Sequence, residues 1–209
     1  KKTLISSGAN LNEVHIAYCP ERVLPGNIMT ELVGNDRVIG GLTSVSTKKA
    51  SDFYRSFVNG NILETDSKTA ELCKLTENSF RDLNIAFANE LSIICDKQGI
   101  NVWDLIKLAN RHPRVNILKP GIGVGGHCIA VDPWFIVSQD SKNTKLIRSA
   151  REVNNYKTKW VINKIKGIAA KHLINTGKSE SPFSKKTGFS PLFRAAFTIW
   201  RPEPLKARN

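Results

Sequence analysis

The sequence predicts an α/β fragment followed by a mainly α-helical central domain that contains one long helix. Before residue 68, short apolar segments alternate with one helical segment. After that point, apolar side chains recur every three or four residues over two long stretches. We therefore expect three parts, with an α/β part at 1–68, a helical part at 69–172 and an unpatterned tail at 173–209.

The first part contains three strand candidates and one helix candidate. The strands are expected at 14–19, 37–41 and 61–65, and the helix at 46–58. Strand, helix, strand is an α/β pattern, but it is too short for a complete doubly wound sheet. Because the chain also lacks an initiator Met, we expect it to start inside a longer protein.

The long helix is predicted over 69–97. No Pro or Gly interrupts this stretch before Gly99, which is a plausible C-cap. A helix of roughly 28 residues would be about 42 Å long. Its apolar positions are Leu72, Leu75, Phe80, Leu83, Phe87, Leu91 and Ile94. A helix of this length is typical of the spine of a helical domain or of a dimer interface.

A shorter helix is expected at 102–110, before Pro113. Residues 111–135 form a loop rich in glycine and proline, and 143–171 return to helical spacing. Beyond His172 the chain mixes Trp, Phe, Arg and Pro without any period. We expect this tail to be largely disordered, and we hypothesise a frameshift between about residues 172 and 192.

The chain is strongly basic, with 31 Lys and Arg against 18 Asp and Glu and a net charge of +13. Such a charge is found in nucleic-acid-binding modules. Here, however, basic residues alternate with acidic ones and form no run of five. This pattern favours solvated helix faces and a small anionic substrate, with no nucleic-acid partner.

No apolar stretch approaches the roughly 18 to 20 residues that span a bilayer, and the N-terminus does not resemble a signal peptide. We therefore expect no membrane partner and a cytoplasmic location. Four cysteines occur, and none forms a Cys-x-x-Cys pair, which argues against a zinc site. Free thiols are expected in a reducing compartment.

Cys128 is the first candidate for chemistry. Gly123, Gly125 and Gly126 precede it, and Asp132 follows four residues later. Glycines let the backbone approach a ligand closely, and backbone N–H groups near a thiol can stabilise an oxyanion. The alternatives are a tight turn with an inert cysteine, or a dinucleotide-binding loop. The second is weak because no clear strand precedes the glycines.

Lys74 and Asn78 are four residues apart and so share one helix face. They lie in a polar stretch of the long helix, which is either a solvated face or a site for developing negative charge. Glu21 follows the end of a predicted strand, where active sites of α/β folds often lie. The alternative for Glu21 is an ordinary surface carboxylate.

Four blocks of sequence resemble the UDP-glucose/GDP-mannose dehydrogenase family. They are Tyr18-Cys-Pro-Glu-Arg-Val-Leu-Pro-Gly26, Asn35-Asp-Arg-Val-Ile-Gly-Gly41, Ala70-Glu-Leu-Cys-Lys-Leu-Thr-Glu-Asn78 and Gly125-Gly-His-Cys-Ile-Ala-Val-Asp-Pro-Trp134. They occur in the family's order, and the resemblance covers about residues 10–172. Arg111-His-Pro-Arg-Val-Asn-Ile-Leu118 looks closest to bacterial members that act on UDP-N-acetyl-D-mannosamine.

The resemblance implies that NAD oxidises C6 of the sugar twice, from alcohol to aldehyde to acid. Cys128 matches the nucleophile that forms a thiohemiacetal and then a thioester. Lys74 and Asn78 match the groups that stabilise oxyanions. Asp132 matches the carboxylate that orders the lysine and a water, and Glu21 matches the glutamate of thioester hydrolysis.

The resemblance also implies a substrate site and a homodimer formed through the central helices. The matching substrate positions are Arg22, Val23, Leu24, Arg114, Gly125 and Gly126. No cofactor-binding residue and no metal ligand is assigned.

Three departures from the family weaken this interpretation for the isolated chain. No strand–glycine loop–helix segment matches the family's pyrophosphate-binding loop, and no second nucleotide-binding domain follows His172. Ile122 stands where close relatives usually have proline. The alternative is therefore an inactive truncated fragment that acts at most as a helical dimerisation module.

Overall fold

The computed structural model describes residues 2–10, 13–24 and 26–176. It divides into two compact units, Lys1–Asn78 and Ser79–Asn209. The division falls inside helix α4 (Ser67–Gln98), which therefore contributes its first turns to one unit and its remainder to the other. Each unit is described by itself.

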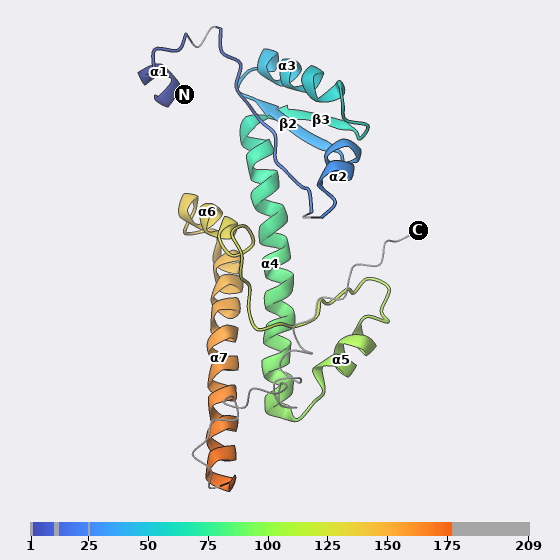
Figure 1. Cartoon of the computed structure of the whole chain (residues 1–209), viewed down its shortest axis with the longest axis vertical. Coiled ribbons are helices and arrows are strands. Elements are labelled where there is room, and N and C mark those ends of the chain that lie inside the picture. Colours follow the sequence, from blue (N-terminus) through green and yellow to red (C-terminus); the bar gives the residue numbers. More distant parts are fainter. Residues whose placement is uncertain (1, 11–12, 25, 177–209) are drawn as a thin grey trace. The chain divides into compact units, whose positions relative to one another are not determined.

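The first unit is built on a three-stranded sheet in the order β1-β2-β3. Figure 1 labels β2 and β3. Strand β1 (Ala17–Tyr18) is antiparallel to β2 (Arg37–Gly41), and β2 is parallel to β3 (Ile62–Asp66). Helix α3 (Ser44–Arg55) connects the two parallel strands and packs against them. Two short helices, α1 (Lys2–Ser6) and α2 (Ile28–Gly34), precede β2.

Strand β2 is the core of this unit, and all five of its residues are buried. Gly40 is required there by close packing. A Cβ atom at this position would lie 2.2 Å from the carbonyl oxygen of Asp66 and 2.7 Å from the Cβ of Ala70. Glycine therefore lets the first turn of α4 pack directly against the central strand, and this fixes where α4 begins.

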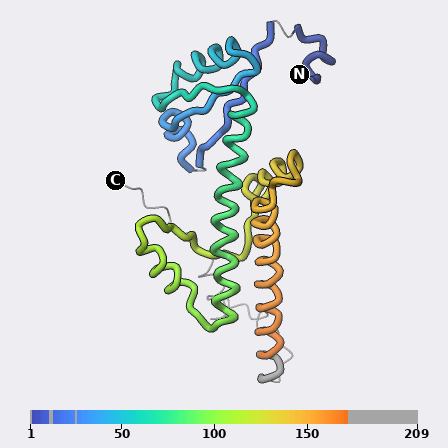
Figure 2. The backbone as a smooth tube through the Cα atoms, turned by 180° about the vertical axis from the view of Figure 1, so that it is seen from behind, coloured from blue at the N-terminus to red at the C-terminus, as the bar shows by residue number. Residues whose placement is uncertain are grey.

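The second unit is organised around two helices that run in the same direction. Beside α4 lies α7 (Lys145–Thr176), and Figure 2 shows the pair from behind. Later residues of α4 contact later residues of α7: Asp82 contacts Arg151, and Ser92 contacts Lys157. Two parallel helices need a return connection, which here consists of α5 (Val102–Ala109), a long loop and α6 (Asp132–Gln139).

A buried polar network joins α4 to α7. Arg151 Nη1 donates to Asp82 Oδ1 at 2.6 Å, and Asn154 Nδ2 donates to the same oxygen at 2.8 Å. Asn89 Nδ2 donates to Asn154 Oδ1 at 2.8 Å. Because these side chains are removed from water, their hydrogen bonds must be made with one another. The network therefore fixes the register of the two helices.

Lys157 extends the polar contacts along the pair by donating to Ser92 Oγ at 2.6 Å. Its ammonium also lies 4.1 Å from the centre of the Trp160 ring. Burial disfavours the charged form and lowers the pKa of Lys157 to about 8. The interior of the helix pair thus holds a cation close to losing its proton.

The predicted fold class is confirmed, with a small three-stranded sheet followed by long helices. Strand β2 agrees with its predicted range, whereas β1 is shorter than expected. Helices α1, α2 and α6 were not predicted, because each has at most eight residues and shows little periodicity.

The predicted loop at 111–135 is wrong at its end. Helix α6 begins at Asp132 with Pro133 in its first turn, a position where proline fits a helix. Helix α7 continues to Thr176, a few residues past the expected end. The rest of the predicted tail lies outside the described residues. In the described part of the chain, no helix is both long and apolar enough to cross a membrane.

The Asp82–Arg151 pair generates the first prediction. Asp82→Leu leaves the Arg151 charge buried without its carboxylate, so we expect the free energy of unfolding to fall by about 3–5 kcal/mol. Chemical denaturation measures this loss, and the double variant Asp82→Leu/Arg151→Leu should lose less than the single variant. Asp96→Leu is the control. Its pair with Lys164 is partly exposed, so that substitution should cost about 1 kcal/mol or less. Equal losses for Asp82→Leu and Asp96→Leu would contradict this assignment.

Candidate functional site

The candidate residues fall into two groups, one in each unit. Glu21, Arg22, Val23, Leu24, Lys74 and Asn78 belong to the first unit. Arg114, Gly125, Gly126, Cys128 and Asp132 belong to the second. The structure therefore describes the geometry within each group.

Glu21 lies just after β1 and is held by three hydrogen-bond donors. Its Oε1 accepts the backbone N–H of Arg22 at 2.7 Å and that of Val23 at 3.1 Å. Arg37 Nη1 reaches both carboxylate oxygens at 3.1 Å. Burial alone would raise the pKa of Glu21, but these hydrogen bonds and the Arg37 charge lower it below its usual value. Glu21 is therefore an ionised carboxylate with a fixed orientation.

Arg37 is the residue that the sequence analysis missed in this unit. Its side chain is buried, and its Nη2 donates to the carbonyl of Leu32 at 2.7 Å. The guanidinium also lies 5.8 Å from the centre of the Tyr54 ring. A basic residue at the first position of an otherwise apolar strand was the available signal, since a buried charge needs a partner.

The backbone of the Arg22–Leu24 segment is already engaged. Glu21 takes the N–H groups of Arg22 and Val23, and Glu31 Oε2 accepts that of Leu24 at 2.8 Å. The guanidinium of Arg22 pairs with Glu77 of α4 at 2.6 Å. A ligand at this segment would therefore meet side chains or carbonyl groups, because these three N–H donors are in use.

Lys74 and Asn78 lie one turn apart on α4, as their spacing predicts. Lys74 is half-buried and Asn78 is buried. Farther along α4, in the second unit, Ser79 and Asp82 are buried as well. The interpretation of this polar stretch as simply a solvated face is therefore wrong for Asn78, Ser79 and Asp82.

A pocket of about 400 Å³ opens at the carboxyl ends of β2 and β3. In open α/β sheets this edge is where dinucleotides bind. Its lining residues are Gly41, Leu42, Thr43, Ser44, Thr47, Glu64, Thr65 and Asp66. The polar groups of this lining are largely engaged within the protein. Arg55 pairs with Glu64, Asp66 accepts from the first turn of α4, and Thr43 caps α3. Because carboxylates also repel a pyrophosphate, the described lining does not form a complete NAD site.

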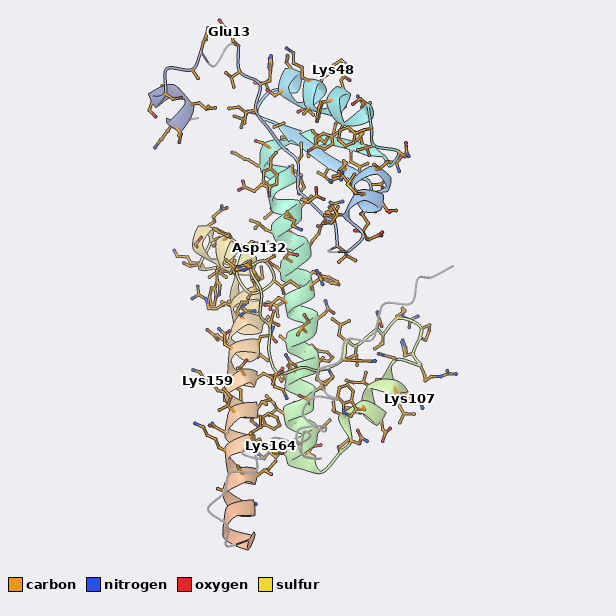
Figure 3. All side chains as sticks on the ribbon, viewed as in Figure 1. Glu13, Lys48, Lys107, Asp132, Lys159 and Lys164 are labelled. Carbon is orange, nitrogen blue, oxygen red and sulfur yellow. The ribbon has the colours of Figure 1, made fainter. Side chains whose placement is uncertain are left out.

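In the second unit, Cys128 lies in the loop that leads to α6, and its side chain is exposed. The carbonyl of Cys128 accepts the N–H groups of Val131 at 3.0 Å and Asp132 at 2.8 Å. This turn brings Asp132 to the first position of α6, where Figure 3 labels it. A carboxylate in the first turn is favoured by the helix dipole.

The glycines before Cys128 shape the loop in different ways. Gly126 has φ +86° and Gly123 φ +149°, conformations that favour glycine. A Cβ atom on Gly123 would lie 2.1 Å from Thr158 Oγ1 of α7, so the loop touches that helix closely. Residues 111–131 contain no strand. The dinucleotide-loop alternative is therefore wrong, since that motif needs a strand before its glycines.

Arg114 is exposed in the segment that follows α5. Its backbone N–H donates to His112 Nδ1 at 3.3 Å. Asn110 closes this segment through two hydrogen bonds, donating to the carbonyl of Ile117 at 2.9 Å and accepting its N–H at 2.7 Å. The backbone around Arg114 is thus well held. Among the described residues, no group of three or more His, Cys, Asp or Glu side chains could hold a metal ion.

Comparison with known proteins links this chain to nucleotide-sugar dehydrogenases. UDP-N-acetyl-D-mannosamine dehydrogenase of Escherichia coli strain K12 is 65% identical over 169 residues, which are 81% of this chain and 40% of that protein. The enzyme of the same name from Campylobacter jejuni is 64% identical over 156 residues, 75% of this chain and 38% of that protein. The chain therefore spans about two fifths of the length of the curated relatives it matches.

Solved structures that resemble this chain are nucleotide-sugar dehydrogenases as well. The UDP-D-ManNAc dehydrogenase of Pyrococcus horikoshii matches with a TM-score of 0.71 and 46% identity, over 76% of this chain and 38% of that one. The Staphylococcus aureus UDP-N-acetyl-mannosamine dehydrogenase Cap5O matches with a TM-score of 0.70 and 49% identity, over 81% and 41%.

Two models of one family also match the chain. The NAD binding domain of the UDP-glucose/GDP-mannose dehydrogenase family matches residues 1–58, and its central domain matches residues 68–156. The first description confirms the expectation that NAD is the cofactor of the family. Because the two matches together span more than half of the chain, this chain belongs to the UDP-glucose/GDP-mannose dehydrogenase family.

Proposed function

We propose that this chain carries the catalytic cysteine of a cytoplasmic, NAD-dependent UDP-N-acetyl-D-mannosamine dehydrogenase. The product would be the corresponding uronate, for cell-surface polysaccharide. The observation that carries the proposal is the exposed Cys128 in a glycine-rich loop at the start of α6. Support also comes from relatives of that name at 64–65% identity. Residues 1–68 would complete the NAD-binding domain, and 69–172 would form the central domain.

In the proposed reaction C6 is oxidised twice, and NAD, when bound, would accept one hydride in each oxidation. The alcohol would first lose a hydride and its hydroxyl proton to give the aldehyde. The Cys128 thiolate attacks the aldehyde carbon and forms a carbon–sulfur bond, and the resulting alkoxide takes up a proton to give a thiohemiacetal. Loss of the second hydride together with the hydroxyl proton gives a thioester, which water cleaves to the carboxylic acid and the free thiol. A thiolate suits both steps, because it is a strong nucleophile and a competent leaving group.

Other side chains would act on the charges that develop. Lys74 and Asn78 can donate hydrogen bonds to an oxyanion, and Asp132 can accept from a lysine and a water. Glu21 is kept ionised by Arg37 and its own turn. It can therefore accept a hydrogen bond from the hydrolytic water and orient that water. It is poorly suited to donate a proton.

We also propose that two copies associate through the central helices. Phe80, Phe87 and Ile94 follow one another at intervals of seven on α4, and all three are exposed. Residues seven apart form a stripe along a helix, as in the seam of a coiled coil. A second copy would offer the same apolar stripe, which makes the contact self-complementary.

The alternative is an inactive fragment that only associates through these helices. It is suggested by two facts: residues 1–209 contain no pyrophosphate-binding loop, and the match spans about two fifths of the curated relatives. The two functions differ in NADH production once the family's remaining domains are supplied, because the first expects the residues of this chain to catalyse the reaction and the second expects them only to mediate association.

Our second prediction is that Cys128 reacts fastest of the four cysteines in folded protein. Cys95 is buried, Cys19 and Cys73 are half-buried, and burial raises the pKa of the Cys19 thiol despite opposing effects of Tyr54 and Arg37. Alkylation with iodoacetamide, mapped by mass spectrometry over time, measures the order. Faster labelling of Cys73 or Cys95 would show that the loop does not present Cys128 as described.

The third prediction tests the reaction itself. A chimera in which residues 10–172 replace the matching part of the Escherichia coli relative should produce NADH from UDP-N-acetyl-D-mannosamine. The purified chain alone should produce none. Cys128→Ala in the chimera should lower kcat by at least about a hundredfold, because it removes the nucleophile. Cys73→Ala is the matched control and should keep activity. A folded chimera without turnover would favour the inactive fragment.

The fourth prediction concerns association. Phe87→Glu places a charge within the proposed apolar seam and should convert the dimer to a monomer, as measured by sedimentation equilibrium. Phe53→Glu is the matched control, because Phe53 of α3 is 65% exposed against 51% for Phe87 but lies outside the seam. Loss of association in both variants, or in neither, would count against the central helices as the interface.

A further inference from the structure

The glycine-rich loop is attached at its beginning to a buried side chain of α4. The backbone N–H of Gly121 donates to Asn89 Oδ1 at 2.8 Å. Asn89 has a relative exposure of 0%, so no solvent competes for this amide. The attachment point lies seven residues before Cys128 in the chain.

The orientation of the Asn89 amide is determined by its other partner. Its Nδ2 donates to Asn154 Oδ1 at 2.8 Å. If the amide were turned over, an NH₂ group would face the N–H of Gly121, and two donors would oppose each other. Asn89 can therefore accept from the loop only while Asn154 presents its oxygen.

Asn154 is oriented in turn by Asp82. Arg151 donates to Asp82 Oδ1 at 2.6 Å, and its charge opposes the rise in the pKa of Asp82 that burial causes. Because this oxygen acts as an acceptor, Asn154 must present its NH₂ group, which donates to the same oxygen at 2.8 Å. The Asp82 carboxylate thus determines which group donates in each of the hydrogen bonds that follow. The last of these hydrogen bonds holds the backbone of the loop.

A second contact and a turn hold the rest of the loop. Gly123 lies against Thr158 of α7, the next turn after Asn154. The carbonyl of Cys128 accepts two N–H groups at the start of α6, and α6 packs on α7. The loop is consequently fixed before and after the segment that presents the thiol.

We propose that Asn89 is a positioning residue for Cys128, and that it acts through the hydrogen bond to Gly121. Asn154 is its oriented partner, and the Asp82–Arg151 pair sets the polarity of both amides. This role rests on the proposed function of Cys128 as nucleophile. Its test uses no turnover, so that it can fail or succeed independently of the dehydrogenase assay.

The test follows the loop in the purified chain with four single variants and the double variant Asn89→Leu/Gly121→Pro. Asn89→Leu removes the acceptor, and Gly121→Pro removes the donor without altering α4 or α7. Gly121→Ala keeps the donor, and its Cβ would meet only the carbonyl oxygen of Gly123 at 3.9 Å. Lys157→Met disturbs the same helix pair at its contact with Ser92 and leaves the hydrogen bond between Asn89 and Gly121 in place.

We expect hydrogen exchange at residue 121 to accelerate by about tenfold in Asn89→Leu, from the loss of one hydrogen bond. The Cys128 alkylation rate should rise in Asn89→Leu and in Gly121→Pro, and the double variant should show no further rise. Gly121→Ala and Lys157→Met should stay within about twofold of the wild type. If Asn89→Leu does not fold, the Cys128 alkylation rates of Gly121→Pro and Gly121→Ala are compared instead. A faster rate in Gly121→Pro alone supports the proposal.

Three results would overturn the proposal. One is an unchanged Cys128 rate in folded Asn89→Leu or in Gly121→Pro. Another is an equal effect of Lys157→Met, which would make Asn89 merely a part of helix packing. The third is a double variant whose rate is the product of the two single effects, because Asn89 would then not act through Gly121.

Discussion

The carboxylate of Asp82 is the group on which the second unit depends. It is completely buried and can only accept hydrogen bonds, so each partner must present a donor. Arg151 supplies the compensating charge, and Asn154 supplies the amide. Apolar contacts alone would let two parallel helices slide, since such contacts carry no direction. The buried charge converts a general attraction between α4 and α7 into one defined alignment.

The first unit uses an ion pair differently. Arg37 is buried, but the Glu21 that it holds remains about half exposed. One side of that carboxylate is therefore fixed by the protein while the other faces solvent. A group of this kind keeps its charge and its orientation and still reaches a ligand. The Asp82–Arg151 pair is buried on both sides and can act only through other residues, whereas the Glu21–Arg37 pair can contact a ligand directly.

The sequence allowed the long helices and β2 to be predicted, because periodicity involves many residues. The role of Cys128 as nucleophile stays a prediction. It did not reveal the polar groups inside the helix pair. Asp82, Asn89 and Asn154 look like members of solvated faces, since burial of a polar residue depends on which helix lies beside it. Arg37 was overlooked for the same reason, as its partner lies 16 positions away. Helix α6 escaped because its apolar residues are not confined to one face, whereas α5, of the same length, has a clear apolar face and was predicted.

Gly123 has a consequence for how this gene can vary. Every single-base change that replaces a glycine with another amino acid introduces a Cβ atom, and here that atom would meet Thr158 Oγ1. The hydroxyl group, rather than the loop, is the part that can give way. A substitution at codon 123 is therefore more readily accepted in lineages where codon 158 has already changed to glycine or alanine, which have no γ atom. The φ of +149° at residue 123 also disfavours any residue with a side chain. The order in which two substitutions arise thus becomes part of the loop's evolutionary history.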